Sequence, residues 1–371
     1  MWARRDSNSH GFKAHGFLRP ACLPFHHSPL KYPVPLTLSL IFERPYYILT
    51  SMTIQEIYDL AVQMGVKADP RGTQGVKDFL ARAKKEYDSL PDNKKKLVDL
   101  ETLKSPYSDS RILYGNNKIK VKKILAGIDA QTAEILLADR LNQKGEKIDL
   151  VISHHPDGHA LASLHEVMDV QIDMYADNGV PVNVAHALFE ERKGVVRRSI
   201  NPLNHSRTSD AARLLNVPLM VLHTIWDNMG HHFMRGYIEN KNYFNVGEVL
   251  DHINEIPEFI EGTKGKAGPQ IVAGSPSSRA GRVMVNFTGG TNPSKELYVE
   301  LAKAGVGTLV EMHVSEDSLK EMRKSHINVI DVGHMAADSI GANLFLDELE
   351  KRGVEALPCS GLVRVRRSKG K

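Results

Sequence analysis

Cysteine is almost absent from this chain of 371 residues, which contains only Cys22 and Cys359. Two cysteines cannot form the disulfide framework of a small secreted domain, and this low content is typical of proteins from a reducing compartment. Long apolar runs are absent too, because none reaches the roughly 18–20 residues that span a bilayer. The sequence therefore predicts a cytoplasmic protein with no membrane span.

The chain also lacks a strong excess of charge. Its formal net charge is +4, with 25% charged residues. The short run Lys94-Lys95-Lys96 lies in a polar helical stretch, and the basic tail from Arg364 to Lys369 suits a solvated terminus. No stripe of Lys and Arg is present, so nucleic-acid binding is not indicated. The length is ample for a buried core and suits two domains.

Residues 1–51 differ from the rest of the chain. They are rich in His, Pro and Ser and contain only two acidic residues, Asp6 and Glu43. Met52 is a second possible start, and Thr53 and Glu56 behind it have the spacing of a helix capping box. We expect folding to begin near Met52. The leading segment is interpreted as an over-extended gene start, with a transit peptide as the alternative.

The remaining sequence predicts an α/β fold of two lobes with mostly parallel sheets. Strand-like runs alternate with helical patterns, which is typical of βαβ units. A helical segment is expected at 52–118, a first α/β lobe at 119–260, a Gly-, Lys-, Pro- and Ser-rich linker at 261–281, and a second α/β lobe at 282–371. Strands are expected at residues 119–127, 148–153, 181–185, 218–223, 282–287, 307–311 and 328–332.

Two adjacent histidines, His154 and His155, follow the apolar run 148–152 and precede Pro156. In an open α/β sheet, ligands bind at the carboxyl ends of the strands, and imidazole is the commonest metal-ligating side chain. Successive strand residues point to opposite faces, so the two histidines are expected to serve two different ions. The alternative is a pair of surface loop histidines.

Three later strand ends each carry a histidine and an acid four residues apart. On a helix, such a pair shares one face and could hold a common ion. The alternative is an ordinary helix start, with the acid favouring the helix dipole. The three pairs are His186 with Glu190, His223 with Asp227, and His334, preceded by Gly333, with Asp338. Parallel strands bring their carboxyl ends to one edge, so within a lobe these groups are expected to converge.

The ordered motifs resemble the GTP cyclohydrolase I type 2 homologues, also called the Ngg-one-interacting-factor-three-like family. The resemblance rests on His-His-Pro at 154–156, the later histidine–acid pairs, the strand at 121–130 and the strand with a glycine turn at 282–290. It covers residues 119–357. It implies two α/β lobes with two metal ions in the cleft between them, and a homo-oligomeric ring of subunits.

The resemblance also implies a set of metal ligands. His154 and His155 would each ligate one ion, His334 would join one of them, and Asp338 stands where the family has a bridging Glu. For the remaining carboxylate Glu190 is preferred. Asp227 is its competitor, because 223–227 matches the family's His-Thr-x-x-Asp pattern literally but lies about twice as far past His155 as expected.

Such a ligand set suits borderline divalent metals: Zn, Mn, Fe, Co or Ni. Two ions about 3.5–4 Å apart lower the pKa of a bridging water, which predicts a hydrolase or cyclohydrolase acting on a nucleotide-like or phosphorylated small molecule. The alternative is a non-catalytic metal-binding scaffold or protein-interaction module.

Acid–base candidates are His186 and Asp129, although Asp129 also suits a helix cap. The turn at Gly289 and Gly290 precedes Asn292, a possible N-cap, and Pro293 at the first helical position. Free backbone amides at such a turn could bind an anion. A plain strand-to-helix turn is the alternative.

Overall fold

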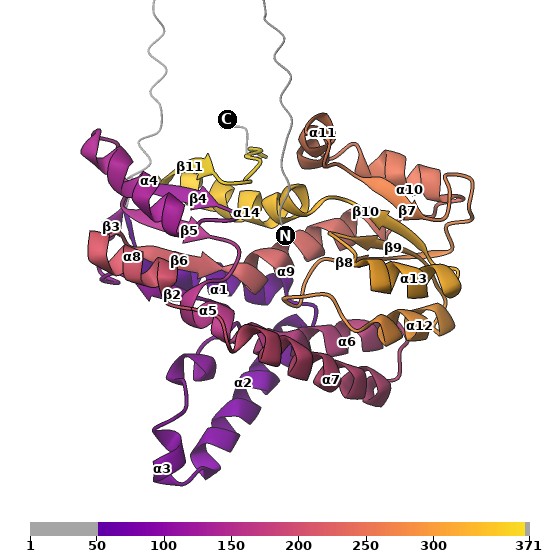
Figure 1. Ribbon diagram of the computed structural model, residues 1–371, viewed down its shortest axis with the longest axis horizontal. Coiled ribbons are helices and arrows are strands. Elements are labelled where there is room, and N and C mark those ends of the chain that lie inside the picture. Colours follow the sequence, from indigo (N-terminus) through magenta and orange to yellow (C-terminus); the bar gives the residue numbers. More distant parts are fainter. Residues whose placement is uncertain (1–50, 368–371) are drawn as a thin grey trace, which may run out of the picture. The chain divides into compact units, whose positions relative to one another are not determined.

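The computed structural model describes residues 51–367 (Figure 1). These residues lie in one compact unit, Ile48–Lys371. The interpretations of residues 1–50 and of the tail beyond residue 367 lie outside the described residues. Among the described residues, regular structure begins at Met52 and Thr53, and Thr53 caps helix α1. Its Oγ1 accepts from the Glu56 amide at 3.1 Å, and Glu56 Oε2 accepts from the Thr53 amide at 2.6 Å. The predicted capping box is confirmed.

Two parallel-rich sheets organise the fold. The five-stranded sheet has the order β11-β4-β5-β6-β2, and only β2 is antiparallel to its neighbour. The four-stranded sheet has the order β7-β10-β9-β8, and only β7 is antiparallel. A short antiparallel pair, β1 and β3, lies outside both. The strands are β1 Met52–Thr53, β2 Ser110–Tyr114, β3 Lys120–Val121, β4 Lys123–Gly127, β5 Leu150–Ser153, β6 Leu219–Leu222, β7 Gln270–Ala273, β8 Arg282–Asn286, β9 Val306–Glu311, β10 Asn328–Asp331 and β11 Glu355–Cys359.

Helices cover both faces of both sheets, which confirms a mixed α/β fold. The five-stranded sheet packs on α1, α9 and α14 on one face and on α4 and α8 on the other. The four-stranded sheet packs on α6, α7, α12 and α13 on one face and on α9, α10, α11 and α14 on the other. The α-helices are α1 Ile54–Ala68, α2 Gly72–Ser89, α3 Asp92–Lys95, α4 Thr132–Gln143, α5 Gly158–Ala162, α6 Asp169–Asp177, α7 Val182–Ile200, α8 Arg207–Leu215, α9 His223–Ile238, α10 Val246–Ile253, α11 Pro257–Lys264, α12 Lys295–Lys303, α13 Glu316–Lys324 and α14 His334–Lys351. No helix among residues 51–367 is long and apolar enough to cross a membrane.

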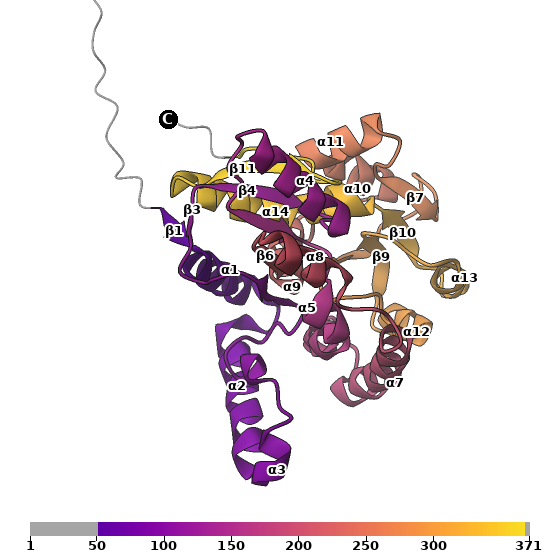
Figure 2. The same ribbon diagram turned by 60° about the vertical axis from the view of Figure 1, so that its left-hand side comes forward.

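Helices α9 and α14 connect the two sheets (Figures 1 and 2). Trp226 near the start of α9 and Phe345 near the end of α14 belong to the core of the five-stranded sheet. Ile238 at the end of α9 and Ala336 at the start of α14 belong to the core of the four-stranded sheet. The two helices therefore run in opposite directions, and each contributes to both cores.

Several elements differ from the expectation. The run 181–185 is not a strand but the start of α7, because Ala185, Phe189, Val196 and Ile200 continue the helical spacing and are buried on one face. The polar stretch before residue 117 contains β2, and the expected linker contains β7. The last strand, β11, does not extend the second lobe. It pairs with β4 in the five-stranded sheet, where Leu357 faces Leu125.

Candidate metal centre

Six candidate ligands lie where the strands of both sheets end. His154 and His155 follow β5 directly. The neighbouring strand β6 leads into α9, whose first turns carry His223 and Asp227. Strand β10 of the other sheet leads, through Val332 and Gly333, into α14 with its pair His334 and Asp338. Chain segments that are far apart in sequence thus meet at facing strand ends, because parallel strands gather such residues at one edge.

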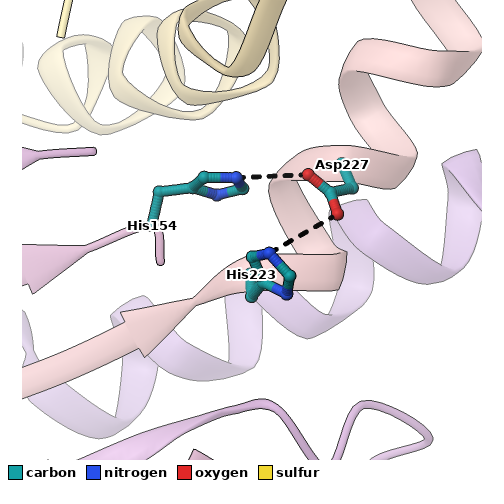
Figure 3. A group of neighbouring side chains, drawn as sticks. All are labelled: His154, His223 and Asp227. Carbon is teal, nitrogen blue, oxygen red and sulfur yellow. Dashed lines mark ion pairs between the residues drawn. The ribbon is translucent and has the colours of Figure 1, made fainter. Parts of the chain in front are cut away.

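One group consists of His154, His223 and Asp227 (Figure 3). His154 Nε2 lies 3.2 Å from Asp227 Oδ1, and His223 Nε2 lies 3.9 Å from Asp227 Oδ2. One ligand atom from each of the three residues lies within 4.8 Å of the others, and all three residues are buried. The spacing suits side chains that surround a single ion.

A second group consists of His154, His155 and Asp338, which also offer ligand atoms within 4.8 Å of one another. Asp338 Oδ2 lies 3.6 Å from His154 Nε2 and 3.3 Å from His155 Nε2. His334 joins this group, because its Nε2 lies 3.3 Å from both Asp338 Oδ2 and His155 Nε2. The structure therefore brings His155 of the first sheet to the His334–Asp338 pair of the second.

Hydrogen bonds to the opposite ring nitrogens orient three of the four imidazoles. His155 Nδ1 lies 2.6 Å from Asp129 Oδ1, His223 Nδ1 lies 2.8 Å from Asp109 Oδ2, and His154 Nδ1 lies 3.3 Å from the Leu222 carbonyl oxygen. Metal-ligating histidines commonly hold their second nitrogen in this way, which fixes the ring and its tautomer. The three Nε2 atoms are thereby directed at the two carboxylates.

The buried polar atoms of this cluster fit a divalent ion. Within the part of the chain that the structure describes, His154 Nε2 and both carboxylate oxygens of Asp338 form no well-aligned hydrogen bond. Their polar neighbours are one another and the other cluster members, at 3.2–3.6 Å. Buried polar atoms without partners are rare and costly. Imidazole nitrogens and carboxylate oxygens are the donors that Zn, Mn, Fe, Co and Ni accept. The donor set and its unmet hydrogen-bonding capacity therefore match a metal site.

The charges of the cluster are strongly coupled. Burial opposes the charged form of His154, but the carboxylates of Asp338 and Asp227 outweigh it and raise the pKa of His154 well above its usual value. Burial would raise the pKa of Asp338, but His154, His155 and His334 hold this pKa well below its usual range. Burial lowers the pKa of His334 to about 4, although Asp338 opposes the shift. Burial also opposes the charged form of His155, but the pKa of His155 is raised as well, chiefly by Asp338. In the metal-free protein, these imidazoles therefore favour protonation and offset part of the buried negative charge.

Metal uptake is expected to strengthen as the pH rises. Because the pKa of His154 is raised, this imidazole keeps a proton near neutrality, and an ion must displace that proton to reach Nε2. Zinc titrations of chelator-treated protein between about pH 6 and pH 8 should show an affinity that increases with pH and a release of protons on binding. A pH-independent affinity would contradict this account.

The predicted site residues fall into three sets. The structure brings His154, His155, His334 and Asp338 together, and it adds Asp227. Asp129 contacts His155. Glu190 and His186 lie elsewhere, on α7, where they line a groove together with Arg71 and Arg197. There Glu190 pairs with Lys193 at 2.8 Å. The structure places Asp227, and not the preferred Glu190, beside His154, because residues 181–185 form a helix and do not end at a sheet edge.

The glycine turn is packed against neighbouring segments. A Cβ at Gly289 would lie 2.1 Å from Gln171, and one at Gly290 would lie 2.9 Å from Val167. Gln171 Nε2 donates to the carbonyl oxygens of Thr288 and Thr291 at 2.8 Å each. Helix α12 begins at Lys295 with Ser294 as its N-cap, two residues later than expected. The glycines thus allow close packing, and anion binding at this turn stays a prediction.

Two members of the cluster are missing from the ligand set that the resemblance implied. His223 had been named as part of a histidine–acid pair, and residues 223–227 match His-Thr-x-x-Asp literally. Asp109 gave no signal, since it lies in a polar stretch before β2. It is fully buried, and its Oδ2 also accepts from Thr224 Oγ1 at 2.7 Å.

Residues 96–360 match the Duf34/NIF3 (NGG1p interacting factor 3) family. The chain belongs to this family. None of the curated proteins matches it. This NIF3-family chain is similar to the crystal structure of a NIF3 superfamily protein from Sphaerobacter thermophilus, with a TM-score of 0.66 and 25% identity, covering 84% of this chain and 99% of that one.

Two further solved structures are more distant. Reduced HcgD from Methanocaldococcus jannaschii has a TM-score of 0.44 and 13% identity, covering 67% of this chain and 88% of that one. A Bacillus cereus protein related to NIF3 has a TM-score of 0.39 and 9% identity, covering 71% and 92%. Similarity at this level supports no inference about the site of this NIF3-family chain.

Substitutions at the two competing acids should separate their roles. Asp227→Asn is expected to reduce bound metal strongly, because Asp227 Oδ1 faces His154 Nε2 at 3.2 Å. Glu190→Gln should leave the metal content unchanged, because its carboxylate pairs with Lys193 on the surface of α7. Elemental analysis of both purified variants provides the measurement. Loss of metal in Glu190→Gln alone would reverse the assignment.

Proposed function

We propose that this NIF3-family protein binds two divalent metal ions at the facing strand ends and acts as a metal-dependent hydrolase on a nucleotide-like or phosphorylated small molecule. One observation carries the proposal. Four imidazole Nε2 atoms and two carboxylates converge in a buried cluster in which the oxygens of Asp338 have no hydrogen bond among the described residues.

The residues present can hold two ions. His154, His223 and Asp227 would hold one, and His155, His334 and Asp338 the other. Asp338 Oδ2 lies within 3.6 Å of three Nε2 atoms, so this carboxylate could contribute to holding either ion. When bound, such a pair supplies a water of lowered pKa as a nucleophile and polarises the substrate.

The chain's own groups have separate tasks. Asp109 and Asp129 fix the rings of His223 and His155 through their Nδ1 atoms. The Asp129 side chain is 52% exposed, so this carboxylate can exchange protons with solvent while it holds His155. The small cavity that adjoins the cluster, lined in part by His223, Asp227 and His334, offers space for a substrate group beside the metal ligands.

The test combines metal content with turnover. Protein purified under metal-replete conditions should contain about two equivalents of metal per chain and should hydrolyse at least one member of a panel of nucleotides and phosphorylated small molecules. His155→Ala should lose metal and turnover while the fold is retained. His232→Ala, an exposed histidine on the same helix as His223, is the matched control and should change neither.

Two other outcomes would count against the proposed hydrolase. Metal content near zero would overturn the proposal of a metal centre. Two equivalents of metal without turnover of any panel member, together with a large loss of thermal stability on metal removal, would favour the non-catalytic scaffold.

A further inference from the structure

The cavity beside the metal cluster is lined by unpaired hydrogen-bond acceptors. It has a volume of about 50 Å³ and lies between the ends of the two sheets, next to His223, Asp227 and His334. Its far wall is formed by Gln171 of α6, Asn286 at the end of β8 and Glu311 at the end of β9, which are 2%, 6% and 2% exposed. None of the residues that line this cavity is a Lys or an Arg.

Two amide oxygens on this wall have no partner. Gln171 uses its Nε2 for the carbonyl oxygens of Thr288 and Thr291, which fixes the amide and leaves Oε1 without a hydrogen bond among residues 51–367. Asn286 uses its Nδ2 for Glu311, with 3.1 Å to each carboxylate oxygen, and its Oδ1 is likewise without a partner in the described part of the chain. Both oxygens can accept hydrogen bonds that residues 51–367 do not supply.

The carboxylate of Glu311 also lacks a compensating charge. No Lys, Arg or His of the described residues forms an ion pair with it. A carboxylate has about four lone-pair sites, and the Asn286 amide and the Tyr298 phenol occupy only part of them. A buried carboxylate of this kind is costly unless a cation or several donors reach it.

The geometry points to this cavity as the binding site for a small planar cation with several N–H donors, the amidinium or guanidinium group of a ligand. Three acceptors from three different elements suit a fork of N–H groups, and a guanidinium pairs with a carboxylate through two parallel hydrogen bonds. Such a group has three or four heavy atoms, and a cavity of about 50 Å³ has room for a few atoms at roughly 10–15 Å³ per water-sized position. The absence of Lys and Arg from the lining disfavours an anion here.

The reaction that a bound amidinium or guanidinium group would undergo rests on the proposed function. A hydrolase of this class would add the oxygen of water to the central carbon and break one carbon–nitrogen bond. The nitrogen would leave as an ammonium ion with both hydrogens of the water, and a urea or amide would remain. The substrate class is thereby narrowed to molecules that carry an amidino or guanidino group. The binding itself requires only the cavity.

Binding should release a proton. Burial raises the pKa of Glu311 to about 8. Hydrogen bonds from Asn286 and Tyr298 oppose this shift, and the charge of Asp331 on β10 adds to it. The other titratable groups that face Glu311 are the phenols of Tyr175 on α6 and Tyr298 on α12, and their pKa values are also raised. At neutral pH the free acid therefore holds its proton, and a bound cation should displace it.

Calorimetric titration with methylguanidine tests the inference. Wild-type protein as purified should bind it, and Glu311→Gln, which keeps the shape and removes the charge, should bind at least about tenfold more weakly. Glu296→Gln, an exposed acid on α12, should bind like the wild type. Urea, the neutral analogue, and methylamine, which lacks the planar fork, should both bind much more weakly than methylguanidine.

Titration of the wild type in two buffers of different ionisation enthalpy needs no variant and should report close to one proton released near neutral pH. The inference is overturned if methylguanidine does not bind, if Glu311→Gln binds it equally well, or if methylamine binds as tightly. Metal content measured on the same sample separates the two proposals. If the sample contains metal but does not bind methylguanidine, the proposed function stands and the inference about the cavity is wrong. If it binds methylguanidine but contains no metal, the inference stands and the proposed function is wrong.

Discussion

Asp338→Asn is expected to abolish most metal binding while the protein remains folded. Asp338 is 2% exposed, and its Oδ2 faces three imidazole nitrogens at 3.3–3.6 Å. Asparagine has nearly the same shape but no charge, so the volume of the core is unchanged. Loss of an outer-shell partner already reduces metal affinity by about 10–100-fold, and loss of a direct carboxylate ligand should exceed that range.

The substitution also changes the metal-free protein. The negative charge of Asp338 raises the pKa of the buried His154, so in Asp338→Asn this imidazole should lose its proton more readily. The measurement is metal equivalents per chain by elemental analysis, with zinc affinity from a competition titration and circular dichroism to verify the fold. Asp251→Asn, an exposed acid on α10, is the control. A folded Asp338→Asn protein with the metal content of the wild type would remove Asp338 from the site.

The sequence predicted the strand-end histidines because their signals are local. An apolar run followed by His154, His155 and Pro156 reports a buried strand and its abrupt end within a few residues. The pair His334 and Asp338 is equally local, since both side chains lie in the first turns of one helix. Such features depend only on residues that are close in the sequence. They can therefore be recognised without knowledge of the tertiary structure.

The preferred acid, Glu190, lies away from the cluster and Asp227 lies in it, because distance along the chain does not measure distance in space. Residues 158–215 add α5 to α8 between β5 and β6. The two strands are nevertheless neighbours, with Val151 facing Leu219. Asp227 therefore lies beside His154 despite the long separation. The literal motif match was better evidence than the count of residues.

Asp109 could not be predicted for a related reason. Strand β2 is antiparallel to β6, and Ser110 faces Leu222. This register places the preceding Asp109 beside the following His223, where the carboxylate holds Nδ1. The pairing depends on which edge of the sheet β2 occupies. No local pattern in a polar stretch indicates which strand β2 will pair with. The position of β11 is equally hidden from local patterns, because this last strand pairs with β4 from a distant part of the chain.

Gly341→Ala is expected to destabilise the fold and disturb the metal site together. Helix α14 crosses α9 at Gly341, where an added Cβ would lie 1.9 Å from the carbonyl oxygen of Trp226 and 2.7 Å from its carbonyl carbon. Both atoms belong to backbone, so the helices must move apart. Overpacking of this kind typically costs about 1–3 kcal/mol and occasionally more. Since α9 carries Asp227 and α14 carries Asp338, the same movement separates ligands.

Two glycines of the partner helix α9 provide matched controls. A Cβ at Gly230 would lie 3.5 Å from the Gly341 nitrogen, an ordinary contact, and a Cβ at Gly236 would meet no atom within 4 Å. Alanine is favoured over glycine inside a helix by about 1 kcal/mol, so Gly230→Ala should be close to neutral and Gly236→Ala mildly stabilising. Urea unfolding of the metal-free proteins gives the free energies, and elemental analysis gives the metal content. The contrary result is that Gly341→Ala equals Gly230→Ala in unfolding free energy and in metal content. That result would show that the close crossing of α9 and α14 is not required to hold Asp227 and Asp338 in place.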